Sequence, residues 1–204
     1  MIGILDYGLG NIQAFVNVYK RLGINTRVVR LPTELSHISR LILPGVGAFD
    51  HAMTLFNKSG LRSPVEELVT HKHLPLLGIC VGMQMLAESS EEGKMPGLGL
   101  IKGKVLSLSN LCSIDLFRLP HMGWNNVSFL GSSILSDGLD NEPQFYFLHS
   151  FYFAAQCQND VIASVDYGGR FACAVARSNV MGVQFHPEKS HRSGTQLLKN
   201  FSEI

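Results

Sequence analysis

Charged residues are scarce in this sequence, and neither sign of charge is in excess. Asp, Glu, Lys and Arg make up only 16% of the 204 residues, and 17 basic against 16 acidic side chains leave a formal net charge of +1. Proteins that bind nucleic acid through its phosphates carry a basic stripe, and this sequence has none. We therefore expect a partner or substrate other than nucleic acid or another polyanion.

Long apolar runs are missing as well. No uncharged apolar stretch approaches the roughly 20 residues that a helix needs to cross a bilayer, although apolar residue types make up 46% of the chain. The opening residues, MIGILDYG, have no basic leader before Asp6. We therefore expect no signal peptide, no membrane association and a cytoplasmic location.

Cysteines are few, and their spacing does not pair them. The chain has 4, namely Cys80, Cys112, Cys157 and Cys173. They form no C-x-x-C motif and lack the density of a disulfide scaffold, which favours reduced thiols. We expect all but Cys80 to be packing residues.

Linkers and internal repeats are absent too, so we expect one domain over residues 1–204.

Strand and helix patterns alternate through the first half of the chain. Short apolar runs predict strands at residues 2–5, 26–30, 40–43 and 74–79, and helical periodicity predicts helices at residues 12–22, 32–39, 50–58, 63–72 and 83–88. This alternation predicts an α/β fold with a mostly parallel central sheet and helices on both faces. The Gly8-Leu9-Gly10 turn has Gln13 where a dinucleotide fingerprint has its third glycine, so we expect no NAD site.

The second half of the chain has a different pattern. From Gly97 onward strands shorten and turns crowd in, as in WNNVSF, QFYFLHSFYF and VIASVDYGGRF. Gly168-Gly169 and Ser178-Asn179 are typical of hairpin turns. We expect additional antiparallel strands joined to the parallel sheet, and a closing helix over residues 196–204.

The segment LPLLGICVGMQ combines a strand, a sharp turn and a helix. In its G-x-C-x-G motif, Gly78 and Gly82 remove Cβ atoms that would collide in a tight strand-to-helix turn, leaving Cys80 at the apex. A thiol at a helix N-terminus is favoured as thiolate. The alternative is a buried packing cysteine at a strand end, so the decision depends on neighbouring groups.

One candidate neighbour is the glycine-rich loop that follows residues 40–43. Gly45 and Gly47 lie in PGVGAF, at the carboxyl end of an expected strand. Such a loop can turn backbone N–H groups toward an oxyanion, although an ordinary tight turn is the alternative.

A second candidate neighbour is His186-Pro187-Glu188, which follows a strand expected at residues 180–185. Residues two apart in an extended segment point the same way, and Pro187 favours an extended backbone. Glu188 could then orient His186 so that its free ring nitrogen accepts a thiol proton. The alternatives are a turn with a solvated glutamate and a metal site with His191, and no zinc-ligand spacing elsewhere supports the latter.

Together these features resemble the class I, triad-type glutamine amidotransferases. The resemblance covers essentially the whole chain, through DYGLGN, LPGVGAF, LGICVGMQ, SSEEG, GLGLIKGKV, LPHMGWN, YFLHSFYF and GVQFHPEKS. Within this family it is closest to the glutaminase subunits of imidazole glycerol phosphate synthase. It implies a three-layer, flavodoxin-like fold, with no cofactor and no metal.

The resemblance also implies roles for individual residues. Cys80 would attack the side-chain amide of L-glutamine, His186 would move the proton, and Glu188 would orient His186, giving glutamate and ammonia. The oxyanion hole would be formed by Val81, Gly45, Val46 and Gly47, with rearrangement of the loop. Glutamine would be bound by Gln84, Glu92, Ser150 and Phe151. The family has Tyr more often at residue 151, so the contacts implied there are those of the backbone.

The implied partner is a separate (β/α)8-barrel cyclase. It would form a heterodimer with this chain and use the ammonia to make imidazole glycerol phosphate and AICAR in histidine biosynthesis. The docking surface would be formed by Asn11, Pro120, His121, Met122, Trp124 and Lys189. The one Trp of the chain suits an interface centre, with a core position as the alternative. We interpret His149, in an apolar strand, as a hydrogen-bonded core histidine.

Three other functions are compatible with parts of the sequence. SSEEGKMPGLGLI and NIQAFVNVYKRLG also resemble a paralogous branch that supplies ammonia to a surface-polysaccharide sugar amidotransferase. A non-catalytic regulatory module on the same fold would not need the complete Cys, His and Glu set. A peptide-cleaving cysteine hydrolase would leave the PHMGWN segment without a role.

Overall fold

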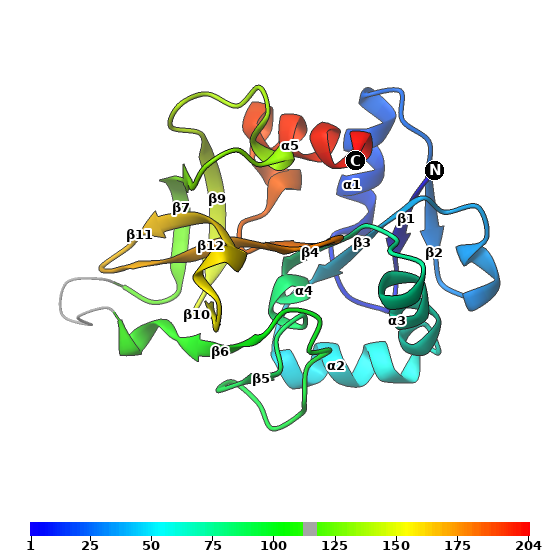
Figure 1. Ribbon diagram of the computed structural model, residues 1–204, viewed down its shortest axis with the longest axis horizontal. Coiled ribbons are helices and arrows are strands. Elements are labelled where there is room, and N and C mark those ends of the chain that lie inside the picture. The colour runs from blue at the N-terminus through cyan, green and yellow to red at the C-terminus, as the bar shows by residue number, and fades with distance from the viewer. Residues whose placement is uncertain (112–117) are drawn as a thin grey trace.

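The computed structural model describes residues 1–111 and 118–204. Its centre is an eight-stranded sheet with the order β2-β1-β3-β4-β13-β12-β11-β8. Helices α1 and α5 lie on one side of this sheet, and α2 and α3 lie on the other (Figure 1). This confirms the α/β architecture that the alternating strand and helix patterns predict.

Five strands form the parallel part of the sheet. Their bounds are β1 Ile2–Leu5, β2 Thr26–Val29, β3 Arg40–Gly45, β4 Leu76–Cys80 and β13 Val180–Val183. Strand β1 pairs with β2 and β3, β3 pairs with β4, and β4 pairs with β13, all in parallel. Strands β1, β4 and β13 are buried throughout, because a parallel sheet covered on both faces leaves no solvent-facing positions.

The place of β13 differs from the sequence-based expectation. The sequence predicts antiparallel strands throughout the second half, whereas β13 runs parallel to β4 inside the sheet. The tight turn at Ser178, with φ 55°, joins it to the antiparallel strand β12, as expected. Local patterns reveal that hairpin but not the pairing with β4, which comes much earlier in the chain. As a result, β3, β4 and β13 end at the same edge of the sheet.

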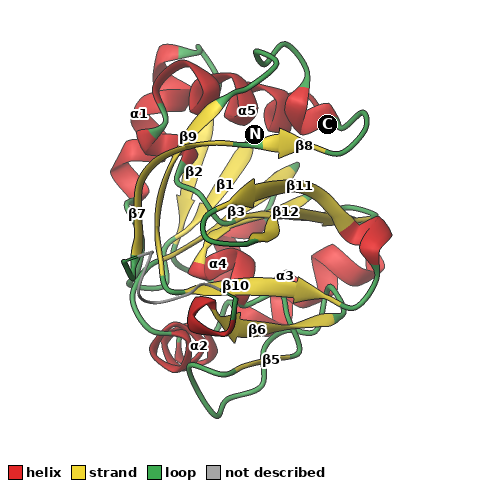
Figure 2. Cartoon of the chain, turned by 90° about the vertical axis from the view of Figure 1, so that its left-hand side faces the viewer, coloured by secondary structure: helices red, strands yellow, loops and turns green. Residues whose placement is uncertain are grey.

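The remaining strands extend the main sheet or form two smaller ones. Their bounds are β5 Ser89–Ser90, β6 Gly103–Ser107, β7 His121–Asn126, β8 Ser128–Phe129, β9 Gln144–His149, β10 Phe151–Ala155, β11 Val161–Asp166 and β12 Arg170–Arg177. One small sheet has the order β10-β6-β5, and the other pairs β7 with β9 (Figure 2). Ser150 alone separates β9 from β10, so the chain passes there from one small sheet to the other.

The longer helices lie close to their predicted positions. Their bounds are α1 Ile12–Arg21, α2 Phe49–Lys58, α3 Arg62–His71 and α5 His191–Glu203. Helix α5 begins at His191, before the expected residue 196. The sequence pattern of its first turn does not predict a helix. Gly194 weakens the helical pattern there, yet a Cβ at this position would lie 1.9 Å from the Pro187 carbonyl oxygen.

Two predicted helices are shorter than expected. Helix α4 covers only Val81–Gln84, and residues 32–39 form a single 3-10 turn, Pro32–Leu35. Beyond α4 the chain leaves the helix because the Glu88 N–H bonds to the Gly103 carbonyl and Ser89–Ser90 pair with β6. Other 3-10 turns are Leu108–Asn110, Ile134–Ser136, Gln158–Asp160 and Pro187–Lys189.

A single buried apolar cluster runs through the described residues, from Ile2 in β1 to Phe201 in α5. Aromatic side chains from the second half complete it; the rings of Phe145 and Phe185, for example, stack with their centroids 4.0 Å apart. None of the helices in the described part of the chain combines the length and the apolar composition that a membrane span needs.

Candidate active site

Cys80 lies at the apex of a tight turn between β4 and α4. Its φ of 55° and ψ of −114° are unusual for a residue with a side chain, as expected at a strained nucleophile turn. A Cβ on Gly82 would lie 1.9 Å from the Leu43 carbonyl oxygen, and one on Gly78 would lie 2.6 Å from the Gly82 carbonyl oxygen. Glycine is therefore required on both sides of the cysteine, which supports the functional interpretation of G-x-C-x-G.

The glycine-rich loop after β3 lies directly against this turn. Gly45 pairs in register with Cys80, and a Cβ on Gly45 would lie 2.3 Å from the Gly82 nitrogen. Gly47 has a φ of 80°, and nothing lies within 4 Å of the position of a Cβ there. Val46 is 36% exposed. The start of the loop is thus packed against the nucleophile turn, whereas open space lies beside Gly47 at its tip.

His186 and Glu188 meet beyond the end of β13. The His186 Nδ1 atom lies 3.0 Å from Glu188 Oε1, and both side chains are buried, with exposed fractions of 5% and 1%. The predicted pairing is correct, but its predicted cause is wrong. Pro187 opens a 3-10 turn, so this turn rather than an extended backbone brings the two side chains together.

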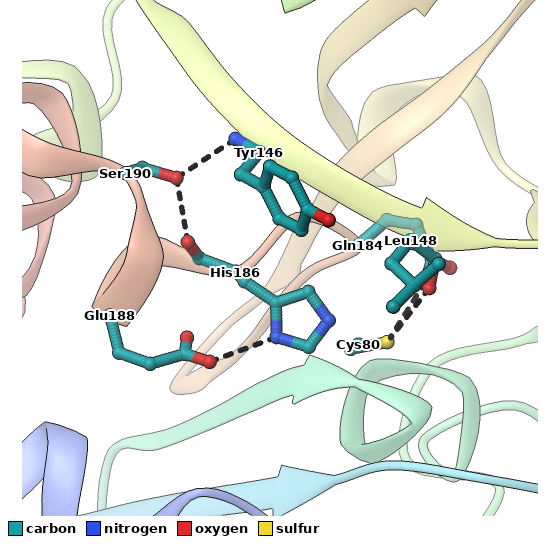
Figure 3. A network of polar contacts seen from close by, with 7 residues as sticks. All are labelled: Cys80, Tyr146, Leu148, Gln184, His186, Glu188 and Ser190. Carbon is teal, nitrogen blue, oxygen red and sulfur yellow. Dashed lines mark hydrogen bonds and ion pairs between the residues drawn. The ribbon is translucent and has the colours of Figure 1, made fainter. Parts of the chain in front are cut away.

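Ser190 fixes the backbone that carries His186. Its hydroxyl donates to the His186 carbonyl oxygen at 2.6 Å and accepts from the Tyr146 N–H at 3.0 Å, which ties the turn to β9. Figure 3 shows the His186 ring between the Glu188 carboxylate and the Cys80 sulfur. The three groups are therefore arranged as carboxylate, imidazole and thiol in sequence.

The charge of His186 follows from these neighbours. Burial by itself would lower the pKa of His186, but hydrogen bonds to Cys80 and Glu188, with the charges of both groups, raise it to about 10. His186 is therefore an imidazolium at neutral pH. The Cys80 sulfur lies beside this ring, and the thiolate is the nucleophilic form of cysteine.

A cavity of about 310 Å³ opens above Cys80 and His186. Its lining residues are Val46, Gly47, Cys80, Val81, Gln84, Glu92, Pro120, Leu148, His149, Ser150, Phe151, His186 and Lys189. The structure therefore gathers every residue expected to bind glutamine, together with three of the four expected oxyanion residues. Gly45 is not part of the lining and supports the loop from behind.

Two of the expected glutamine-binding residues have fixed partners of their own. Gln84 Nε2 donates to the Phe151 carbonyl oxygen at 3.3 Å and to Gln184 Oε1 at 3.1 Å. Glu92 Oε2 accepts from the Phe49 N–H at 2.9 Å, at the start of α2 and just beyond the glycine-rich loop. Glu92 thus links the cavity wall to the end of that loop.

Sequence reasoning missed Gln184. This side chain is 0% exposed, and its Nε2 atom lies 3.7 Å from Cys80 Sγ. A signal was present, because Gln184 interrupts an apolar strand two positions before His186, so the two residues share a spacing that puts side chains on one side of a strand. Leu148 was also missed; its carbonyl oxygen lies 3.9 Å from Cys80 Sγ.

Two of the residues expected at a partner interface, Pro120 and Lys189, line this cavity, and the expectation for His121 needs a correction. Met122 and Trp124 alternate along β7 and are 60% and 46% exposed, whereas His121 points inward and is only 2% exposed. The expectation that His121 contributes its side chain to a surface is therefore wrong, because alternate residues of a strand face opposite sides. Asn11, Pro120 and Lys189 are exposed. We call the outward side of β7, with Pro120, Met122 and Trp124, the β7 face.

Trp124 and Lys189 are braced by aromatic neighbours. The Trp124 ring stacks on His191 with centroids 5.0 Å apart, and Lys189 Nζ lies 5.7 Å from the centroid of the Tyr146 ring. Both side chains are thus held in place although they are exposed. Pro120 and Lys189 also line the cavity, so the β7 face continues into the cavity mouth.

The other cysteines differ from one another. Cys173 is buried, as expected, whereas Cys157 is exposed and is not a packing residue; Cys112 lies outside the described residues. Within the part of the chain that the structure describes, no group of three or more His, Cys, Asp or Glu side chains could hold a metal ion.

Comparison with known proteins places this site in a family. The family model described as "Glutamine amidotransferase class-I" matches residues 3–204. The chain is 57% identical to a Bdellovibrio bacteriovorus protein and 50% identical to a Leptospira interrogans protein, over 100% of both chains in each case. Both proteins are named "Imidazole glycerol phosphate synthase subunit HisH".

A solved structure described as "Crystal structure of glutamine amidotransferase" has the same fold. It superposes with a TM-score of 0.77, covering 99% of this chain and 97% of the other, at 24% identity. The family model and the two relatives cover all or nearly all of the chain, and Cys80 and His186 line one cavity, with Glu188 hydrogen-bonded to His186. The chain belongs to the class-I glutamine amidotransferase family.

Proposed function

We propose that this chain is the glutaminase subunit of an imidazole glycerol phosphate synthase and releases ammonia from L-glutamine with Cys80, His186 and Glu188. The observation that carries this proposal is the buried contact of His186 with Glu188, made where His186 and Cys80 line one cavity at the carboxyl edge of the sheet. The full-length identity of 57% to a protein named as a HisH subunit supports the choice of pathway.

The first half of the reaction forms a thioester. The Cys80 thiolate attacks the side-chain amide carbon of glutamine, and the carbonyl oxygen becomes an oxyanion. Backbone N–H groups at Val81 and in the loop of Gly45, Val46 and Gly47 stabilise that charge. The His186 imidazolium then gives its proton to the amide nitrogen, the C–N bond breaks, and ammonia leaves.

The second half regenerates the nucleophile. Neutral His186 removes a proton from a water molecule that attacks the thioester carbon, the C–S bond breaks, and glutamate is released with Cys80 again a thiolate. Glu188 holds the Nδ1 atom of His186 in a hydrogen bond, so that the other ring nitrogen faces the reaction. Gln184, through its Nε2 atom, adds a hydrogen-bond donor to the sulfur.

The substrate occupies the cavity between α4 and β10. Gln84, Glu92, Ser150 and the backbone of Phe151 form its walls and hold the glutamine with its amide over Cys80. Open space lies beside Gly47 at the tip of the glycine-rich loop, and this suits an oxyanion hole that is completed only when the partner is bound.

The β7 face receives the partner. Its exposed Met122 and Trp124 are the kind of apolar and aromatic anchors that concentrate binding energy at interface centres. Pro120 and Lys189 line the cavity next to this surface, so that a (β/α)8-barrel cyclase docked there would receive ammonia directly from the cavity, and exposed Asn11 is a further proposed contact. His121 contributes to the docking surface only through its strand.

Co-purification from the native cell tests the pathway. We expect the chain to bring down a cyclase that makes imidazole glycerol phosphate and AICAR, and we expect glutamate release to rise when that cyclase and its acceptor are added. Recovery of a sugar amidotransferase instead would assign the chain to the paralogous branch. A chain that releases no glutamate with any co-purified partner would contradict the proposal.

A further inference from the structure

A chain of hydrogen bonds that the reaction above does not use runs from β7 to the cavity wall. His121 Nδ1 lies 3.0 Å from His149 Nε2, and His149 Nδ1 lies 2.8 Å from the Phe151 carbonyl oxygen. At the other end, Asn125 Nδ2 lies 3.4 Å from His121 Nε2. The two histidines are opposite each other in the register of β7 and β9, and both are buried, at 2% and 6% exposure.

The hydrogen-bond partners of the two histidines leave one choice of tautomer for each ring. A carbonyl oxygen only accepts, so His149 must carry its hydrogen on Nδ1, and its neutral ring then accepts on Nε2. His121 must therefore donate from Nδ1 and accept on Nε2, where the Asn125 amide can donate. Each donor in this series of hydrogen bonds, from Asn125 through His121 to His149, consequently points toward the cavity.

Both rings stay neutral in this arrangement. Burial lowers the pKa of His121 to about 4, and burial together with the nearby His121 and His186 lowers the pKa of His149 to about 3. A second proton on His149 would place an N–H against the N–H of His121.

Stacking also restricts the His121 ring. Its centroid lies 4.6 Å from that of Phe147 and 4.0 Å from that of Tyr167, with both neighbours nearly parallel to it. Tyr167 is held in turn, because its hydroxyl donates to the Arg118 carbonyl oxygen at 2.7 Å. The His121 side chain therefore connects β7 to β9 and to the turn between β11 and β12, on the side of β7 opposite the β7 face.

The series of hydrogen bonds ends at Phe151, in the wall of the catalytic cavity. The Phe151 carbonyl accepts from both His149 and Gln84, which uses both of its lone pairs. Gln84 also donates to Gln184, and Gln184 donates to Cys80 Sγ. The carbonyl that His149 fixes is thus the one that holds Gln84 beside the nucleophile.

We propose that His149 and His121 are positioning residues for the glutamine site, and that their fixed tautomers pass the position of β7 to the wall formed by Phe151 and Gln84. Docking of a partner on the β7 face would then adjust the position of the cavity wall formed by Phe151 and Gln84, through His121 and His149. This second part rests on the proposed function; the positioning of the wall does not depend on a partner.

Two substitutions of His149 separate positioning from filling of space. Asparagine keeps an N–H near the place of Nδ1, whereas phenylalanine keeps a ring but removes the donor to Phe151. Each is combined with Cys80→Ala, and glutamine binding is measured by calorimetry. We expect His149→Phe to weaken glutamine binding roughly tenfold, the loss typical of one hydrogen bond, and His149→Asn to stay within about threefold of the parent.

The outcomes decide between a positioning and a structural role. Equal losses in both folded variants, or no loss in either, would overturn the proposal, because a donor to Phe151 would then be irrelevant. Unfolding midpoints of all three proteins show whether the variants fold. If the Phe variant fails to fold, the binding constant of the Asn variant and the tautomers of the unsubstituted protein still decide the question.

Tautomers are measured without reference to any reaction. In protein labelled with 15N-histidine, we expect ring-nitrogen NMR signals of His121 and His149 to show neutral rings with hydrogen on Nδ1 at neutral pH. Hydrogen on Nε2 or an imidazolium at either residue would overturn the chain of donors. A Cys80→Ala protein that binds no glutamine would refute the proposed function, while this measurement would still decide the tautomers.

Discussion

The geometry of Cys80 depends on the absence of Cβ atoms at three neighbouring glycines. Gly45, Gly78 and Gly82 come from two neighbouring strands and the turn, and a Cβ at any one of them would lie 2.6 Å or less from a backbone atom. Three backbone segments thereby approach closely enough to hold one strained cysteine. His186, next in the line of groups, is fixed by Glu188 on one side and by Ser190 through its backbone.

The roles of His186 and Glu188 lead to a ranked prediction. We expect His186→Ala to lower the kcat for glutamate release by on the order of 10²- to 10⁴-fold, because it removes the proton carrier. Glu188→Gln should cost less, since an amide can still position the ring although it cannot stabilise an imidazolium. Steady-state kinetics of the complex measure both; equal losses would show that the charge of Glu188 is indispensable.

Single residues also show what the sequence could and could not predict. The triad was predictable because glycine spacing and the H-P-E motif are local. Gln184 was not identified, because a lone polar residue in a buried strand is visible but its partner, Cys80, is far away in the chain. His121 was assigned to the surface within PHMGWN, although strict alternation with Met122 and Trp124 would have placed it inside.

Among the elements, β7 joins two functions on its two sides. Met122 and Trp124 face outward, while His121 and Asn125 form the hydrogen-bond chain behind them. The register with β9 places His121 opposite His149, at the point where β9 leads into Ser150 and β10. A partner that docks on this strand is therefore one strand away from the glutamine site.

Docking on β7 gives a prediction about Trp124. We expect Trp124→Ala to weaken the affinity of the partner by roughly thirtyfold or more, as at an interface hot spot, and to reduce partner-stimulated glutamate release. The rate of the isolated chain should not change, because no atom of Trp124 takes part in the reaction. Titration of the partner by calorimetry, combined with kinetics, measures both effects.

A matched substitution provides the control. Leu31, which follows β2, is an apolar side chain that is 58% exposed, and β2 lies away from β7 (Figure 1). Leu31→Ala should leave the affinity of the partner unchanged. If both variants weaken binding alike, the loss at Trp124 does not report a docking surface.

The bounds and pairing of the helices and strands also show how far the sequence alone predicts the fold. Strand β1 and helices α1 to α3 were predicted almost to the residue because their periodicity is local. Helix α4 was predicted too long, because the pairing of Ser89–Ser90 with β6 depends on residues further along the chain. The parallel placement of β13 likewise depends on β4, which no hairpin signal reveals.

At the scale of the whole molecule, the buried histidines make stability depend on pH. The pKa values of His121 and His149, about 4 and about 3, lie below the usual value of 6.5 for histidine. Between these values the unfolded chain binds more protons than the folded one, so the free energy of unfolding falls as the pH is lowered from about 6.5. This contribution to stability is complete only above that pH.

Replacing one of these histidines isolates the effect. Denaturant unfolding between pH 7 and about 4 should give a shallower decline for His149→Asn than for the unsubstituted protein, with the slopes differing by up to about one proton. Carboxylates that titrate in the same range contribute equally to both proteins. Identical slopes would show that His149 is not held neutral in the folded state.

The central claim is that Cys80 only produces ammonia and that a separate partner consumes it. The direct test compares glutamine-dependent and ammonia-dependent product formation in the complex carrying Cys80→Ala. We expect glutamine-dependent synthesis to disappear and ammonia-dependent synthesis to remain at the level of the unsubstituted complex. Loss of both activities in a complex that still assembles, or glutamine-dependent synthesis that survives without the thiol, would contradict the claim.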